Sequence, residues 1–171
     1  LVTGVQTCAL PIFLIDTSGS MASDDRLPLA RRSLNLLIDQ MRPQDHVSMV
    51  AYAGSAGAVL GPTDGRQKLK MRCALESLQS GGSTAGGQGL ALAYALARER
   101  FDPKAVNRVI LLTDGDFNVG VADPARLKDF VAGKRKDGVY LSVYGFGRGN
   151  YNDTMMQALA QNGNGTAAYV D

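Results

Sequence analysis

The chain has 171 residues, of which 45% are hydrophobic and 20% are charged, and its formal net charge at pH 7 is +2. This balance is typical of one globular domain that is large enough to bury a sizeable core. The small net charge argues against a nucleic-acid-binding surface, and no apolar run approaches the roughly 20 residues that a membrane span requires. The sequence therefore predicts no nucleic-acid partner and no membrane span within these residues.

The first residues of the chain, 2–12, resemble a translated short-read sequencing adapter. We therefore divide the chain into a non-native segment, 1–12, and one domain, 13–171, which we expect to be truncated at both ends of the native protein. On this interpretation Cys8 is foreign and Cys73 is the one native cysteine, so no disulfide framework is predicted. A native reading frame through residues 1–12 at the source locus would contradict the interpretation.

Apolar runs that are typical of buried strands alternate with helical patterns along the rest of the chain. We expect strands at 13–15, 47–52, 58–60, 108–113, 139–146 and 166–170. We expect helices at about 24–42, 67–78, 90–97, 124–131 and 152–162.

This alternation predicts a mostly parallel sheet with helices on both faces, which is a three-layer, doubly wound α/β fold. One pair of strands is an exception. The connection at 54–57 is too short for a parallel crossover, which needs a dozen residues or more, so the short strand at 58–60 is expected to run antiparallel.

Three polar loops carry side chains with oxygen donors. Asp16, Ser18 and Ser20 follow the first strand, Thr84 lies in a glycine-rich loop, and Asp114 follows the fourth strand. The first and fourth strands of such a sheet end side by side at the topological switch point, so the two carboxylates should meet there. Two carboxylates in one cleft repel each other, and a divalent cation would relieve that repulsion.

The chemistry of these donors favours one class of metal. All of them are hard oxygen ligands, and the single histidine, His46, lies at the start of a strand and thus away from the strand ends. The sequence therefore predicts Mg²⁺, with Mn²⁺ or Ca²⁺ as alternatives, rather than Zn²⁺. An octahedral Mg²⁺ would keep water ligands or leave a position open to an incoming ligand.

The order D-x-S-x-S, then a distant Thr, then a distant Asp resembles the metal-ion-dependent adhesion site of the von Willebrand factor A (vWA) family. The resemblance covers residues 13–171 and implies a Rossmann-like vWA fold. Its central six-stranded sheet should be mostly parallel, with one short antiparallel edge strand and a strand order resembling 3-2-1-4-5-6.

The same resemblance implies roles for the five site residues. Ser18, Ser20 and Thr84 would bind the metal through their hydroxyl groups. Asp16 and Asp114 would bind it directly or through water. These five residues are the predicted metal ligands, and no residue is predicted to be catalytic.

Three further stretches, 36–45, 113–120 and 145–153, look like a bacterial subfamily of uncharacterised, often envelope-associated vWA proteins. The resemblance implies a metal-dependent adhesion or scaffold module in the cell envelope, where a partner's Asp or Glu completes the coordination of Mg²⁺. The alternative is a cytoplasmic subunit that recruits partners to an ATPase or metal-chelatase machine. Native upstream sequence would separate the two, since a lipoprotein signal supports the first and an adjoining ATPase gene the second.

A Mg²⁺-dependent hydrolase is the less favoured alternative. Position 18 is Ser where phosphatases with an Asp-x-Asp motif need a second Asp, and the loop at 81–87 lacks the Lys of a P-loop. With His46 as the only histidine, no Ser–His–Asp arrangement is available.

Residues beside the predicted metal loops could form a partner-binding rim, for which we name Asp116, Phe117 and Arg148. Each has a simpler alternative. Asp116 could belong to a solvated loop, Phe117 could pack in the core together with Tyr52, and Arg148 could have no role beyond its loop.

Overall fold

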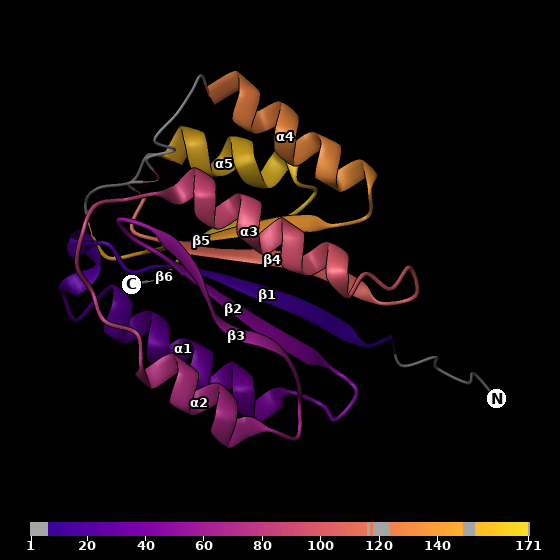
Figure 1. The fold of residues 1–171 in the computed structure, drawn as a ribbon. Coiled ribbons are helices and arrows are strands. Elements are labelled where there is room, and N and C mark those ends of the chain that lie inside the picture. The colour runs from indigo at the N-terminus through magenta and orange to yellow at the C-terminus, as the bar shows by residue number, and fades with distance from the viewer. Residues whose placement is uncertain (1–6, 116, 118–123, 149–152, 171) are drawn as a thin grey trace.

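The computed structural model describes residues 7–115, 117, 124–148 and 153–170. Within these residues the strands form one six-stranded sheet in the order β3-β2-β1-β4-β5-β6 (Figure 1). All neighbouring strands are parallel except β2 and β3, so the predicted order and the antiparallel edge strand are confirmed. The strands are β1 (Ala9–Asp16), β2 (His46–Tyr52), β3 (Ala56–Asp64), β4 (Val106–Thr113), β5 (Tyr140–Phe146) and β6 (Ala167–Val170).

Helices cover both faces of the sheet, as expected for a three-layer α/β fold. One layer contains α3, α4 and α5, and the other contains α1 and α2 (Figure 1). A single 3₁₀ turn, η1, precedes α1. The helical elements are η1 (Gly19–Ala22), α1 (Leu27–Gln40), α2 (Lys68–Glu76), α3 (Gly86–Glu99), α4 (Pro124–Lys136) and α5 (Asp153–Asn162).

The core consists of two apolar clusters, one on each face of the sheet. Along β1, Leu14 points to the cluster that includes α3, α4 and α5, while Phe13 and Ile15 point to the cluster that includes α1 and α2. Successive side chains of a strand face opposite sides, so a strand that is covered on both faces must be apolar throughout. This explains the continuous apolar runs of the sequence.

Several element boundaries differ from those expected. β3 has nine residues. We expected only three, at 58–60, because Gly57, Gly61 and Pro62 interrupt the apolar pattern of the sequence. Such residues are tolerated on an edge strand, where ladder hydrogen bonds and packing are needed on one side only. The first strand is also longer than expected, since Ala9–Ile12, which we assigned to the non-native segment, pair with β4.

The helix that follows the glycine-rich loop begins at Gly86, four residues before the expected start at Leu90. Gly89 lies so close to the sheet that a Cβ atom there would be 2.9 Å from Cβ of Tyr52 and 3.0 Å from Cδ1 of Leu14. Gly89 therefore allows close approach of α3 to the sheet, and Gly86 begins the helix instead of belonging to the loop.

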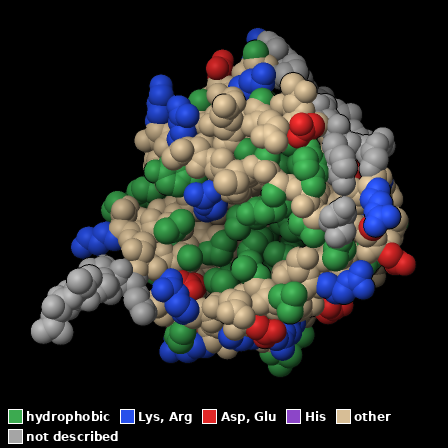
Figure 2. Space-filling view, turned by 180° about the vertical axis from the view of Figure 1, so that it is seen from behind, with side chains coloured by type: hydrophobic (Ala, Val, Ile, Leu, Met, Phe, Trp, Pro, Cys, Tyr) green, Lys and Arg blue, Asp and Glu red, His purple; other side chains and the backbone are tan. Residues whose placement is uncertain are grey.

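The two faces of the sheet are not covered equally. On the side of α1, apolar side chains gather in a hollow (Figure 2). A depression of about 250 Å³ on this side is lined by Phe13, Ser33, Leu34, Leu37, Ile110, Leu112, Tyr144, Phe146 and Val170. Part of the apolar surface of β1, β4 and β5 is thus open among the described residues.

No helix within the described part of the chain is both long and apolar enough to cross a bilayer.

A buried carboxylate ties the strand starts together at the edge opposite the predicted metal loops. The Asp45 carboxylate accepts hydrogen bonds from the backbone N–H of Ala9 at 2.8 Å and from the guanidinium of Arg42 at 2.8 and 3.0 Å. The hydrogen bonds from Arg42 lower the pKa of Asp45 from 3.8 to about 2. Since the folded-state pKa is depressed, this group stabilises the fold above pH 3.8, and the contribution is lost as the pH falls toward 2.

Asp45→Asn is therefore expected to lower the free energy of unfolding by about 2 kcal/mol at pH 7. The difference from wild type should be smaller at pH 3 and small near pH 2, where both proteins lack the charge. Urea unfolding at these pH values measures it. Asp39→Asn is the control, because Asp39 pairs with Arg72 on the exposed surface and should change stability by less than about 0.5 kcal/mol at pH 7. A pH-independent loss in Asp45→Asn would contradict the electrostatic explanation.

Candidate metal centre

The loop after β1 presents its oxygen atoms in a fixed geometry. Asp16 is fully buried, and its Oδ1 accepts a hydrogen bond from the backbone N–H of Ser18 at 2.9 Å. Its Oδ2 accepts hydrogen bonds from the hydroxyls of Tyr52 at 3.2 Å and Thr113 at 3.1 Å. The hydroxyl oxygens of Ser18 and Ser20 lie 3.1 Å apart. The short segment from Asp16 to Ser20 thus directs two hydroxyls to one point beside an oriented carboxylate.

The parallel pairing of β1 with β4 brings Asp114 to this loop. Ile15 pairs with Leu112, so the two strands end together, and the next residue of β4, Thr113, hydrogen-bonds to Asp16. Asp114 is only 2% exposed. Asp16 and Asp114 therefore lie at the same end of two neighbouring strands, where the charge of Asp114 acts on Asp16.

The electrostatics of Asp16 reflect this crowding. Burial raises the pKa of Asp16 above its usual range, and the negative charge of Asp114 acts in the same direction. Hydrogen bonds from Ser18 and Thr113 oppose the rise. Burial also raises the pKa of Tyr52 well above its usual value, so its hydroxyl stays protonated and donates to Asp16. Two acidic groups are thus held together at a cost that a cation would remove.

The glycine-rich loop lies against the first loop. The backbone N–H of Gly81 donates to the carbonyl of Thr17 at 2.8 Å, and that of Gly19 donates to the carbonyl of Gly82 at 3.1 Å. Gly82 has φ of +78°, which favours glycine at this position. Thr84 is half-buried between these contacts and the first turn of α3. All three predicted loops therefore occupy the same edge of the sheet.

One charged residue of the site was missed by sequence reasoning. The Nη1 atom of Arg26 donates to Asp114 Oδ2 at 2.9 Å and to the carbonyl of Ser20 at 2.6 Å. Arg26 comes directly before α1 and belongs to no motif. An arginine at a helix start carries no sequence signal that distinguishes a site residue from a solvated one.

The three proposed rim residues have different outcomes. Phe117 is 7% exposed and packs edge-on against Tyr52 with ring centroids 5.8 Å apart, so it lies in the core and the rim assignment is corrected. Arg148 is exposed, and its backbone N–H donates to Asp25 Oδ2 at 3.2 Å. Asp116 lies outside the described residues. His46 lies at the start of β2, where its Nδ1 is 3.2 Å from the carbonyl oxygen of Gln44.

The donor set fits a hard divalent cation. The described residues contain no group of three or more His, Cys, Asp or Glu side chains that could hold a metal. The described donors at this edge are thus hydroxyl oxygens together with the two carboxylates. Uncharged and charged oxygens of this kind suit Mg²⁺ or Mn²⁺ and not Zn²⁺.

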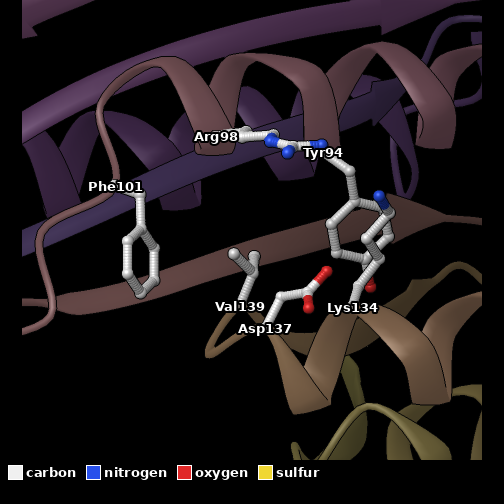
Figure 3. A pocket seen from close by; sticks show the side chains of 6 residues that line it. All are labelled: Tyr94, Arg98, Phe101, Lys134, Asp137 and Val139. Carbon is white, nitrogen blue, oxygen red and sulfur yellow. The ribbon is translucent and has the colours of Figure 1, made fainter.

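A pocket of about 460 Å³ lies away from these loops and contains none of the predicted metal ligands. Its side chains come from the ends of α3 and α4 and the approach to β5 (Figure 3). They are Tyr94, Arg98, Phe101, Lys134, Asp137 and Val139. Arg98 and Lys134 lie in the last turns of their helices, where positive charge is stabilised by the helix dipole. The two positive charges of this pocket thus have a structural explanation.

Known proteins resemble the chain over most of its length. The family model of the von Willebrand factor type A domain matches residues 12–171. The uncharacterized protein YfbK of Escherichia coli (strain K12) is 48% identical over 160 residues, which cover 94% of this chain and 28% of that protein. The likeness to YfbK supports the expected bacterial subfamily, and the chain spans little more than a quarter of that relative.

Two further proteins are similar in sequence or structure. The magnesium-chelatase 60 kDa subunit of Cereibacter sphaeroides is 38% identical over 112 residues, which cover 64% of this chain and 20% of that subunit. The solved structure of an aerotolerance-related membrane protein from Bacteroides fragilis has a TM-score of 0.74 and 25% identity. The superposition covers 96% of this chain and 92% of the chain from Bacteroides fragilis.

Proposed function

The chain belongs to the von Willebrand factor type A domain family, whose members generally act in metal-dependent protein interactions, and we propose that it binds a protein partner through Mg²⁺ at the edge where β1 and β4 end. The partner would contribute an Asp or Glu carboxylate to the ion. One observation carries the proposal: three loops with oxygen donors converge there, and two of them bring buried carboxylates together.

The residues divide into two groups by their contacts. Ser18, Ser20 and Thr84 would hold the ion through their hydroxyl oxygens. Both oxygens of Asp16 already accept protein hydrogen bonds, so Asp16 is suited to hold the ion through water and to fix the loop. Asp114 would supply the second negative charge.

Bound Mg²⁺ would supply an electrophilic position that accepts one outside oxygen ligand. Because the two carboxylates roughly balance its charge, a third carboxylate from a partner is still attracted if one of the two acts through water. Arg148, which is exposed near the first loop through its contact with Asp25, could meet acidic groups of the same partner.

We favour the bacterial cell envelope as the location, because the similar structure from Bacteroides fragilis is named a membrane protein. The alternative is a cytoplasmic subunit that recruits partners to an ATPase or chelatase machine. The likeness to a magnesium-chelatase subunit favours that second candidate. A lipoprotein signal in the native upstream sequence would support the first, and an adjoining ATPase gene the second.

Mn²⁺ is a suitable probe of the proposed ligation, since its effect on water-proton relaxation reports exchangeable water ligands. We expect bound Mn²⁺ to enhance relaxation, and the peptide Gly-Asp-Gly to reduce that enhancement by replacing a water. Gly-Asn-Gly should have no effect. Thr84→Ala should weaken Mn²⁺ binding by about tenfold or more, while Ser83→Ala, the neighbouring exposed hydroxyl, should not.

Two results would contradict the proposal. One is equal Mn²⁺ binding by Thr84→Ala and wild type, which would remove Thr84 from the site. The other is an enhancement that does not change with the aspartate peptide, which would leave no position for a partner carboxylate.

A further inference from the structure

A positive charge already lies between two of the three loops. The guanidinium of Arg26 bridges the carboxylate of Asp114 and the backbone carbonyl of Ser20, at 2.9 and 2.6 Å from its Nη1 atom. The arginine side chain is 18% exposed, and the aspartate side chain is 2% exposed. An ion pair this sheltered from water is screened less than one on the surface, so the guanidinium offsets part of the charge of Asp114.

The guanidinium is only partly satisfied in this position. Its Nε atom is buried and has no hydrogen-bond partner among the described residues. A buried donor without a partner costs free energy. The contacts that hold the guanidinium of Arg26 in place are therefore those of its Nη1 atom, and the charged one is with the Asp114 carboxylate. A cation that binds the Asp114 carboxylate more tightly could therefore displace the guanidinium.

The stem of Arg26 packs against the turn after β5. A Cβ atom at Gly147 would lie 2.7 Å from both Cγ and Nε of Arg26, and Gly147 has φ of +90°. In the same segment, Asp25 Oδ2 accepts the backbone N–H of Arg148 at 3.2 Å. The position of Arg26 is thus connected to the residues that follow β5.

We propose that Arg26 is an internal counter-cation that occupies Asp114 in the metal-free domain and is displaced when a divalent cation binds. The inference rests on the proposed function, since it requires a metal at this edge. Arg26 already occupies Oδ2 of Asp114, and a divalent ion at the same carboxylate would repel the guanidinium, so the two compete. Arg26 therefore lowers the affinity of the site, and its release changes the packing of Gly147.

Calorimetric titration with Mg²⁺ tests the competition. Arg26→Met keeps the apolar stem and removes the charge, and we expect it to bind Mg²⁺ on the order of tenfold more tightly than wild type. Arg26→Gln is a second neutral variant and should change in the same direction. Arg32→Ala removes a charge from the exposed surface of α1 and should leave the affinity within about twofold.

An amide signal gives a readout that a purely structural role would not change. In wild type, Mg²⁺ should shift the amide resonances of Gly147 and Arg148 as the guanidinium leaves. In Arg26→Met this shift should be much smaller, although Mg²⁺ binds.

The outcomes separate the two proposals. Unchanged or weaker Mg²⁺ binding by both neutral variants would overturn the role of Arg26 and leave the metal site standing. No binding of Mg²⁺ by wild type or any variant would overturn the metal site itself. Binding by Arg26→Met but not by wild type would support the competition in its strongest form.

Discussion

Replacing Asp16 with Asn is expected to abolish the stabilisation of this domain by Mg²⁺ while making the metal-free domain more stable. Asp16 is fully buried, and both burial and the charge of Asp114 disfavour its ionised form. Asn keeps the shape and removes the buried charge, and the hydroxyls of Tyr52 and Thr113 can turn to accept hydrogen bonds from its amide group, so the metal-free domain should gain on the order of 1 kcal/mol. The variant also loses half of the negative charge that attracts the ion, so its Mg²⁺ affinity should fall about a hundredfold or more.

Thermal unfolding with and without Mg²⁺ measures both effects. At a Mg²⁺ concentration of about one hundred times Kd, wild type should gain about 2.7 kcal/mol by mass action, and Asp16→Asn should gain almost nothing. Asp24→Asn is the matched control, because Asp24 is an exposed aspartate eight residues further along the chain. An Asp16→Asn variant that is less stable without metal and still responds to Mg²⁺ would show that Asp16 is neither a strained charge nor a part of the metal site.

Gly89→Val is expected to lower the free energy of unfolding by about 3 kcal/mol or more. A Cβ atom at this position would lie 2.9 Å from Cβ of Tyr52 and 3.0 Å from Cδ1 of Leu14, and neither atom belongs to the free end of an exposed side chain. The helix must therefore move away from the sheet. Since the N–H of Gly89 donates to the carbonyl of Ala85, the movement should reach the loop that carries Thr84 and weaken Mg²⁺ binding too.

Gly133→Val is the control for this substitution. Gly133 lies in α4, and a Cβ atom there would contact nothing within 4 Å. Helix propensity alone predicts a change of less than about 0.5 kcal/mol. Urea unfolding of the two variants compares close packing with propensity directly. A similar loss of stability in both variants would mean that the approach of α3 to the sheet is not the cause.

The alternation of apolar runs with helical patterns was enough to predict a mostly parallel sheet with helices on both faces, and the resemblance to the vWA family added the order of the strands. The sequence did not predict the extent of β3 or the start of α3. Gly61 and Pro62 are turn residues by their local preferences, and the edge position of β3 overrides those preferences. Gly86 was assigned to a loop because it stands in a run of glycines. Its place in the helix depends on the ring of Phe117, which would lie 2.7 Å from a Cβ atom at this position and which the sequence nearby does not reveal.

The candidate site was predicted to a similar degree. Asp16 and Asp114 follow apolar strands, so parallel pairing was enough to bring them together. Phe117 was wrongly considered for the rim, because nothing in its neighbouring sequence shows that it packs against Tyr52. Arg26 was missed because its contact with Asp114 joins residues 88 positions apart and depends on how the chain leaves η1.

Calorimetric titration of Mg²⁺ into wild type and Asp16→Asn shows whether the buried carboxylate at the end of β1 helps to hold the ion. We expect a single Mg²⁺ site in wild type and binding that is about a hundredfold weaker in the variant. Equal binding by the two proteins would contradict this expectation, because the buried carboxylate after β1 would then have no part in holding the ion.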